Sequence, residues 1–145
     1  MAAASSAVYD GRTMLELLPP AECWRLVAAA PMGRVGLVVD GEPVILPVNH
    51  AVHDRTVAFR TAGGTKLATV TSWPVVAFEV DGIDDAGRGW SVLVSGRAQR
   101  VADGATRREV EVLGLRPWAP GPKPHWVRIV PRRVSGRRLP RPAPA

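Results

Sequence analysis

The spacing of apolar residues is helical at the start of the chain and becomes extended further on. Between residues 20 and 30 the apolar side chains recur at helical intervals, at Cys23, Trp24, Leu26 and Val27. Two prolines precede this segment, where a first helical turn tolerates them, and Pro31 follows it. The pattern predicts one helix that ends near Ala30, and extended structure from Gly33 onward.

Extended segments then dominate the chain. Strands are predicted at 34–39, 43–48, 57–60, 75–80, 90–101 and 125–130, with a seventh at 133–139. Asp40-Gly41 is a hairpin signal between the first two strands, and Pro43 and Pro47 indicate strand starts, bulges or unpaired edges. Gly96 indicates a bulge or a bend.

Two further helices are predicted, near 65–72 and at 103–113, and the segment 81–89 is expected to be an exposed flexible loop. Six or seven short, mostly antiparallel strands with few helices favour a mostly β fold. The expected architecture is a closed or split antiparallel β-barrel.

The length of 145 residues fits one domain, which we place at 13–139. Residues 1–12 are expected to form a flexible leader, and the proline-rich residues 140–145 a disordered tail. The sequence has no secretory signal and no apolar run long enough for a transmembrane helix, and Cys23 is its single cysteine. We therefore expect a cytoplasmic protein without membrane association.

The formal net charge of +6 raises the question of nucleic-acid binding. All cations except Lys66 and Lys123 are arginines, and six of them follow residue 127. Without this C-terminal group the chain is close to neutral. The distribution argues against nucleic acid as the main partner, because the basic end is equally well explained by solvation or by contact with one phosphate.

The segment 59–67 carries the strongest candidate chemistry. A short strand leads through Gly63-Gly64 into a predicted helix with Thr65 near its N-cap. Such a helix start offers free backbone N–H groups, and the flanking Arg60, Thr61 and Lys66 add charges and a hydroxyl. The segment is predicted to bind a phosphate. The alternative is an ordinary strand–turn–helix connection whose cations are solvated.

The order of several motifs resembles the pyridoxamine 5′-phosphate oxidase-like flavoproteins. The resemblance covers about residues 14–139 and rests on Gly33–Leu37, Pro47–His50, Phe59–Leu67, Gly89–Val92, Pro117–Gly121 and Trp126–Ile129. It implies an FMN-binding split barrel, usually a homodimer with two flavins where the barrels meet. Within this group, the chain most resembles the small branch of flavin- or deazaflavin-dependent reductases, which includes nitroimidazole-reductase-like proteins. The substrate-phosphate pattern of true pyridoxamine-phosphate oxidases is not recognisable.

The resemblance also implies a set of cofactor-binding residues. These are Pro47, Val48, Asn49, His50, Phe59, Arg60, Thr61, Thr65, Lys66, Leu67, Trp90, Ser91 and Trp118. Arg60, Thr61 and Lys66 would hold the phosphate, and the 47–50 segment would run along the isoalloxazine ring. Trp118 would cover the ring from the other subunit or pack in the interface without touching it.

The resemblance implies hydride transfer through the flavin, with a nicotinamide or deazaflavin as electron donor and an unknown small-molecule substrate. No catalytic side chain is required by such chemistry. His50 is a candidate proton donor, with a structural histidine as the alternative. No metal site is expected. The competing functions are a non-catalytic module that holds FMN, a deazaflavin or haem, and a basic interaction protein without a cofactor.

Overall fold

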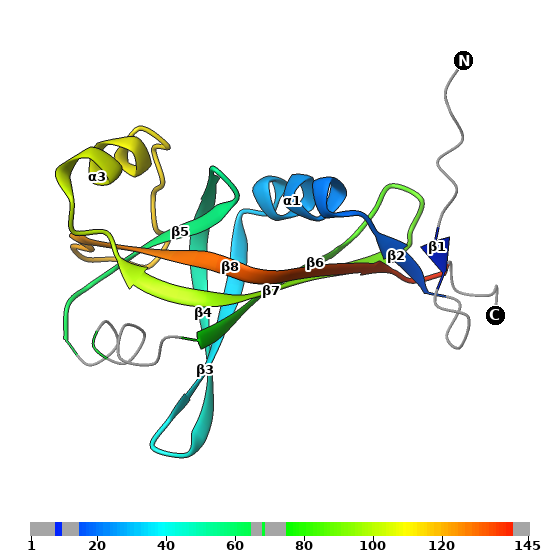
Figure 1. Ribbon diagram of the computed structural model, residues 1–145, viewed down its shortest axis with the longest axis horizontal. Helices are drawn as coiled ribbons and strands as arrows, with labels where there is room; N and C mark the ends of the chain where they lie inside the picture. Colours follow the sequence, from blue (N-terminus) through cyan, green and yellow to red (C-terminus); the bar gives the residue numbers. More distant parts are fainter. Residues whose placement is uncertain (1–7, 10–14, 65–67, 69–74, 141–145) are drawn as a thin grey trace.

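Six antiparallel strands close into a barrel in the computed structural model, which describes residues 8–9, 15–64, 68 and 75–140. The closed order is β8-β5-β4-β3-β6-β7 and back to β8, and β1 and β2 extend the sheet beside β8 (Figure 1). The bounds are β1 Val8–Tyr9, β2 Glu16–Leu18, α1 Pro20–Ala29, β3 Met32–Val39, β4 Glu42–His53, β5 Thr56–Thr61, β6 Val75–Ile83, β7 Gly89–Arg100, α3 Gly104–Glu111 and β8 His125–Arg138. The predicted split-barrel class is confirmed.

The strand β8 closes the barrel. One edge pairs with β7 along almost the whole length, and the other pairs first with β5 and then with β2. The sixth and seventh predicted strands are thus one strand, which corrects the prediction of a break near Pro131. The register between β7 and β8 shifts at Ser95/Gly96, so the predicted bulge at Gly96 is confirmed. Gly96 fits there because an added Cβ would overlap the backbone of Val130 and Pro131.

The β3–β4 hairpin protrudes from the barrel (Figure 1). Only residues 34–36 of β3 pair with β6, and only residues 50–53 of β4 pair with β5. Pro43 and Pro47 therefore lie in a part of β4 whose only strand partner, among the described residues, is β3. This confirms the prediction of unpaired edges, since proline lacks the N–H that a second neighbour would need.

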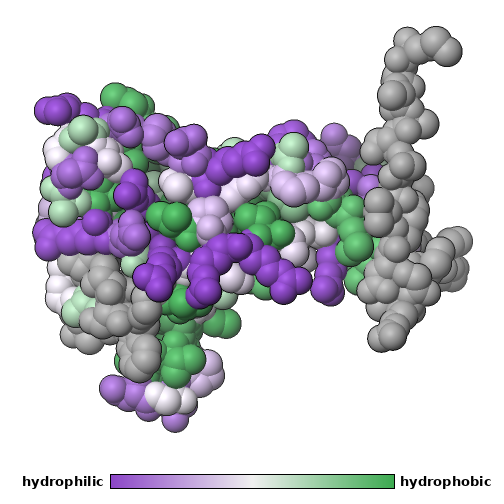
Figure 2. Space-filling model, in the orientation of Figure 1, coloured by the Kyte–Doolittle hydropathy of each residue, from purple (hydrophilic) through white to green (hydrophobic). Residues whose placement is uncertain are grey.

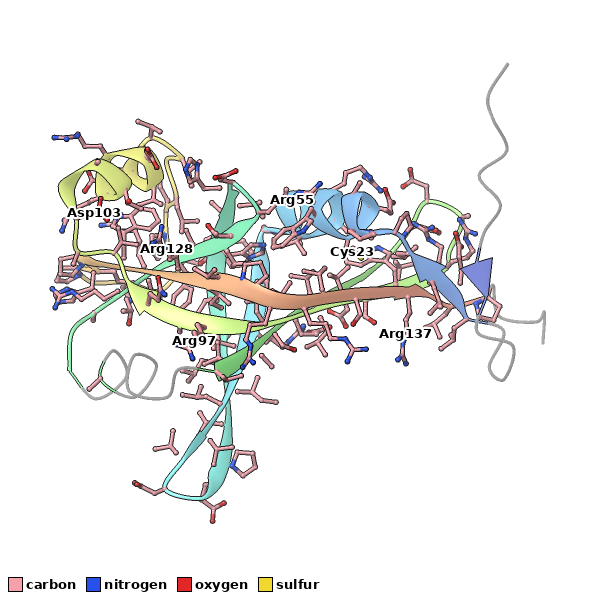
Figure 3. The ribbon with its side chains drawn as sticks, in the orientation of Figure 1. Cys23, Arg55, Arg97, Asp103, Arg128 and Arg137 are labelled. Carbon is pink, nitrogen blue, oxygen red and sulfur yellow. The ribbon has the colours of Figure 1, made fainter. Side chains whose placement is uncertain are left out.

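Along the barrel strands, every second residue directs its side chain inward, and these side chains form the core. Its most buried members include Val35, Phe59, Phe78, Val94, Val127 and Ile129. The apolar side of α1 packs on this core with Cys23 and Val27, and Figure 3 shows Cys23 on the side of the helix that faces the strands. The predicted first helix is confirmed. Within the described residues, neither helix combines the length and the apolar character that crossing a bilayer requires.

The second helix lies outside the barrel. α3 begins at Asp103, whose carboxylate accepts a hydrogen bond from the Thr106 N–H over 2.7 Å. Its Val110 packs with Ala58 and Trp126 against the outer surface of β5 and β8. The prediction of a helix in this region is confirmed. Its position leaves the loop 112–124 between α3 and β8.

The N-terminal strands and the β6–β7 turn meet at the far end of β8. β1 pairs with β2, so Val8 and Tyr9 are strand residues rather than part of a flexible leader. Arg138 lies within 3.5 Å of carboxylate oxygens of Glu16, Glu22 and Asp84. The expected long loop 81–89 is also corrected, because β6 continues to Ile83 and the tight turn contains only 84–88.

Candidate functional site

The two-residue period of β5 separates the candidate phosphate ligands. Arg60 faces outward, whereas Phe59 and Thr61 face inward and are almost fully buried. The Thr61 hydroxyl donates to the backbone carbonyl of Ala62 over 3.1 Å. Arg60 and Thr61 therefore do not present their side chains to one ligand from the same face, which corrects their expected convergence.

The same alternation divides the 47–50 segment of β4. Pro47 and Asn49 face outward, and Val48 and His50 are buried inside the barrel. The His50 ring lies edge-on to Phe78, and its Nε2 is 2.7 Å from the carbonyl oxygen of Val27 in α1. Burial lowers the pKa of His50, which favours the neutral form of the ring. This placement fits a structural histidine, because the ring lies on the opposite face of β4 from Asn49.

A cluster of polar and aromatic side chains forms on the outer face of β4, β5 and β8. On β4 and β5 the pair His50 and Phe59 places the following pair, Asn49 and Arg60, side by side. On β5 and β8, Arg60 is paired with Trp126. The Arg60 guanidinium carbon lies 5.6 Å from the centre of the Trp126 ring, and its Nε donates to the Lys123 carbonyl over 2.9 Å. Asn49 Oδ1 accepts a hydrogen bond from the Trp118 N–H over 2.8 Å. Two predicted site residues thus fasten the loop 112–124 to this outer face.

Sequence reasoning missed the role of Trp126 as the support for Arg60. The alternation of β8 contained the signal, because Trp126 precedes the buried Val127 and must face the other way. Trp118 is 67% exposed, so its indole projects into solvent beside Asn49 of the same chain. The prediction that this side chain covers the ring from a second subunit, or packs in the interface, stays a prediction.

The turn that follows β5 has the geometry expected at a helix start. Gly64 has a φ of 93°, a left-handed conformation that favours glycine, and its carbonyl accepts from the Ala68 N–H over 3.0 Å. An added Cβ on Gly63 would lie 3.1 Å from Nε2 of His125, so little space separates the turn from β8. Thr65, Lys66 and Leu67 lie outside the described residues. Their part in phosphate binding stays a prediction.

The outer-face cluster fits the phosphate of a flavin. Arg60 Nε is bonded to Lys123, and within the described part of the chain its two terminal amino groups have no hydrogen-bond or ion-pair partner. Stacking on Trp126 holds the guanidinium plane in place without neutralising it. A fixed and uncompensated arginine next to a glycine turn is suited to bind an anion.

Trp90 and Ser91 lie far from this cluster. Trp90 is opposite Arg138 and Arg60 is opposite Trp126, and these two partners are twelve residues apart on β8. At 3.3 Å per strand residue the separation is roughly 40 Å. Figure 3 shows Arg137, the register partner of Ser91, near one end of β8 and Arg128 toward the other end. One chain does not bring Trp90 and Ser91 together with Arg60.

Comparison with known proteins identifies the family. Residues 19–138 match the pyridoxamine 5′-phosphate oxidase family, and this range contains every strand of the closed barrel. The chain belongs to the pyridoxamine 5′-phosphate oxidase family. The chain is 36% identical over 124 residues to the uncharacterized protein Rv0080 of Mycobacterium tuberculosis, with 81% of each chain covered.

Solved structures with the same fold include flavin-binding proteins. An FAD binding protein from Mycobacterium smegmatis is 41% identical, with a TM-score of 0.73 and coverage of 85% of this chain and 97% of that chain. An FAD and heme binding protein from the same organism has a TM-score of 0.67, covers 88% of this chain and 75% of that chain, and is 19% identical, which is likeness of fold alone. The resemblance noted in the sequence is thereby confirmed at the level of the family and its fold.

Proposed function

We propose that this member of the pyridoxamine 5′-phosphate oxidase family binds a flavin on the outer face of β4, β5 and β8 and acts as an oxidoreductase. The observation that carries the proposal is the placement of Arg60. Its guanidinium is fixed by Trp126 and Lys123 and faces outward, and Arg60 comes shortly before the Gly63-Gly64 turn in the sequence. Family membership and the 41% identical FAD binding protein support a flavin as the ligand.

The residues of this face have distinct roles in the proposal. Arg60 holds the flavin phosphate, together with Lys66 and Thr65 from the adjoining segment. The outward backbone and side chains of Pro47 and Asn49 border the isoalloxazine ring, and Trp118 closes its edge. A bound flavin supplies hydride transfer between an electron donor and a substrate. The chain itself binds and orients the ring and excludes water from it.

A second copy of the chain completes the site. The surface between the β3–β4 hairpin and β6 is an apolar hollow of about 610 Å³, lined by residues 36–38, 43–45, 75–77 and Ser95. Ile45 is 69% exposed and Val38 51% exposed there, and Figure 2 shows hydrophobic side chains along this hairpin. Covering this surface with a partner removes apolar area from water. A homodimer also offers a way for Trp90 and Ser91 of one chain to approach Arg60 of the other.

The cofactor is FMN or FAD in this proposal, and both contain the phosphate that Arg60 would bind. A deazaflavin presents the same kinds of groups. The second candidate function is a non-catalytic carrier of a flavin, deazaflavin or haem. The inward position of His50 is compatible with both functions, because hydride transfer through a flavin needs no proton donor from this chain.

The test begins with the visible spectrum of the purified full-length protein, after incubation with FMN or FAD and desalting. We expect retained flavin at about one per chain. Arg60→Ala should weaken flavin binding by roughly 10- to 100-fold, because it removes a charge-assisted contact. Arg97→Ala is the matched control, since Arg97 is exposed on β7 and has no ion-pair partner among the described residues. Equal affinity in all three proteins would contradict the proposed site.

Turnover separates the enzyme from the carrier. The flavin-loaded protein is mixed with reduced nicotinamide or reduced deazaflavin, and donor oxidation is followed by absorbance. Catalytic oxidation of the donor supports the oxidoreductase. Stoichiometric binding without donor oxidation supports the carrier. Lys66→Ala in the same assays tests the predicted second cation of the phosphate site.

A further inference from the structure

A second hollow lies directly beside Arg60. It measures about 330 Å³ and is enclosed by the end of α3, the residues that follow it, and the outer face of β5 and β8. Its lining residues are Arg60, Glu111, Gly114, Leu115, Arg116 and Trp126. The volume is within the range of about 300–1,000 Å³ that small-molecule sites occupy.

Two arginines border the hollow, and neither forms an ion pair with a described residue. Arg60 lines the hollow, and its Nε donates to the Lys123 carbonyl over 2.9 Å. Arg116 is exposed and has no hydrogen bond or ion pair to any described residue. Two guanidinium groups that border one hollow are suited to the two phosphates of a dinucleotide, with one guanidinium on each phosphate.

The remaining walls match the rest of a nucleotide. Glu111 Oε1 accepts from Arg107 Nε over 2.8 Å, whereas Oε2 has no partner among the described residues. A carboxylate oxygen of this kind accepts hydrogen bonds from the vicinal hydroxyls of a ribose. Leu115 is partly exposed and supplies the apolar wall of the hollow, against which a purine base packs.

We infer that this hollow takes the adenosine monophosphate half of FAD. The inference rests on the proposed function, because Arg60 is shared between the hollow and the flavin phosphate site. A ligand that ends at the flavin phosphate, as FMN does, leaves Glu111 and Arg116 unused. A dinucleotide continues from that phosphate into the hollow, with Arg116 on the second phosphate and Glu111 on the ribose. The chain is thus built to select FAD over FMN.

The experiment compares dissociation constants for FAD and FMN, by titration of the cofactor-free, full-length protein at fixed ionic strength. We expect FAD to bind about tenfold more tightly than FMN to the unaltered protein. Arg116→Ala should weaken FAD by about tenfold and leave FMN within about twofold. Glu111→Gln should weaken FAD by a few-fold, again without affecting FMN. Arg108→Ala removes the same charge from an exposed position of α3 outside the hollow and should change neither constant.

The outcomes distinguish this inference from the proposed function. Retention of both flavins with equal affinity, unchanged by Arg116→Ala, overturns the inference and leaves the flavin site standing. A similar loss of FAD and FMN in Arg116→Ala also overturns it, because Arg116 would then act on the part that the two cofactors share. Failure of the unaltered protein to bind either flavin overturns the proposed function and the inference with it.

Discussion

The side-chain amide of Asn49 fastens Trp118 to the barrel, although the two residues are 69 positions apart in the sequence. Asn49 Oδ1 accepts from the Trp118 N–H over 2.8 Å, and Asn49 Nδ2 donates to the Pro31 carbonyl over 3.1 Å. One side chain on β4 therefore holds both the segment that leads into β3 and the loop 112–124. The loop forms one wall of the proposed flavin site, so its position depends on Asn49.

Substitution of Asn49 should release this loop. In Asn49→Ala the Trp118 amide loses its acceptor, and we expect its hydrogen exchange to accelerate by roughly fivefold, the effect of losing about 1 kcal/mol of protection. Asn49→Asp keeps an acceptor for Trp118 but cannot donate to Pro31, so the amide should stay protected. Gln99→Ala, at an exposed position of β7, is the control. Unchanged exchange at Trp118 in Asn49→Ala would show that other contacts hold the loop.

The exposed hairpin residue Ile45 should control assembly. A charge at this position cannot be buried against a second copy without a large desolvation cost, so Ile45→Asp is expected to shift the protein from dimer to monomer. Ile83→Asp is the matched control, because Ile83 is 78% exposed and lies outside the apolar hollow. Light scattering coupled to size-exclusion chromatography gives the masses. Equal masses for the two variants would remove the hairpin from the proposed interface.

Gly33 should not tolerate a methyl group. An added Cβ would overlap the Phe78 ring and approach the Glu79 carbonyl oxygen to 2.9 Å. Because Phe78 is fully buried, Gly33→Ala is expected to lower the free energy of unfolding by about 1–3 kcal/mol. Gly104→Ala at the start of α3 meets no atom within 4 Å and should be neutral or slightly stabilising. Urea denaturation measures both, and equal stability of the two variants would contradict this account.

The buried histidine should make stability depend on pH. Burial lowers the pKa of His50 in the folded protein below its ordinary value near 6.5, so the unfolded chain binds a proton that the folded protein does not. The free energy of unfolding should therefore fall as the pH decreases below about 6.5, until the folded pKa is reached. His50→Gln should be less stable at neutral pH but should flatten this slope. A slope that persists unchanged in His50→Gln would assign it to another group.

Periodicity in the sequence predicted most of the elements, because each strand has its own pattern of alternation. The hairpin at Asp40-Gly41 and the bulge at Gly96 carry local chemical signals, and both are present. The single strand β8 was predicted as two, because Pro131 reads locally as a break. Its continuation depends on β7, whose bulge at Gly96 accommodates the proline region. That compensation lies in a different strand and is not visible in the local pattern.

The candidate site, too, was predicted only where its signal is local in the sequence. Arg60 and the Gly63-Gly64 turn were identified from the sequence, since charges, hydroxyls and glycines close together are a local feature. The side chains of Phe59, Thr61, Val48 and His50 lie on the inner faces of their strands, which local charge and composition do not indicate, and the part of these residues in cofactor binding stays a prediction.

The sequence by itself determined the split-barrel fold, the glycine turn and the presence of an arginine beside it, because these follow from spacing over a few residues. Only the tertiary structure decided which side chains share a surface. It stacks Arg60 on Trp126, ties Asn49 to Trp118, and separates Trp90 from Arg60 by the length of β8. These relationships arise from strand pairing over long sequence distances. The register that sets them is fixed by the packing of the whole barrel core rather than by any one segment.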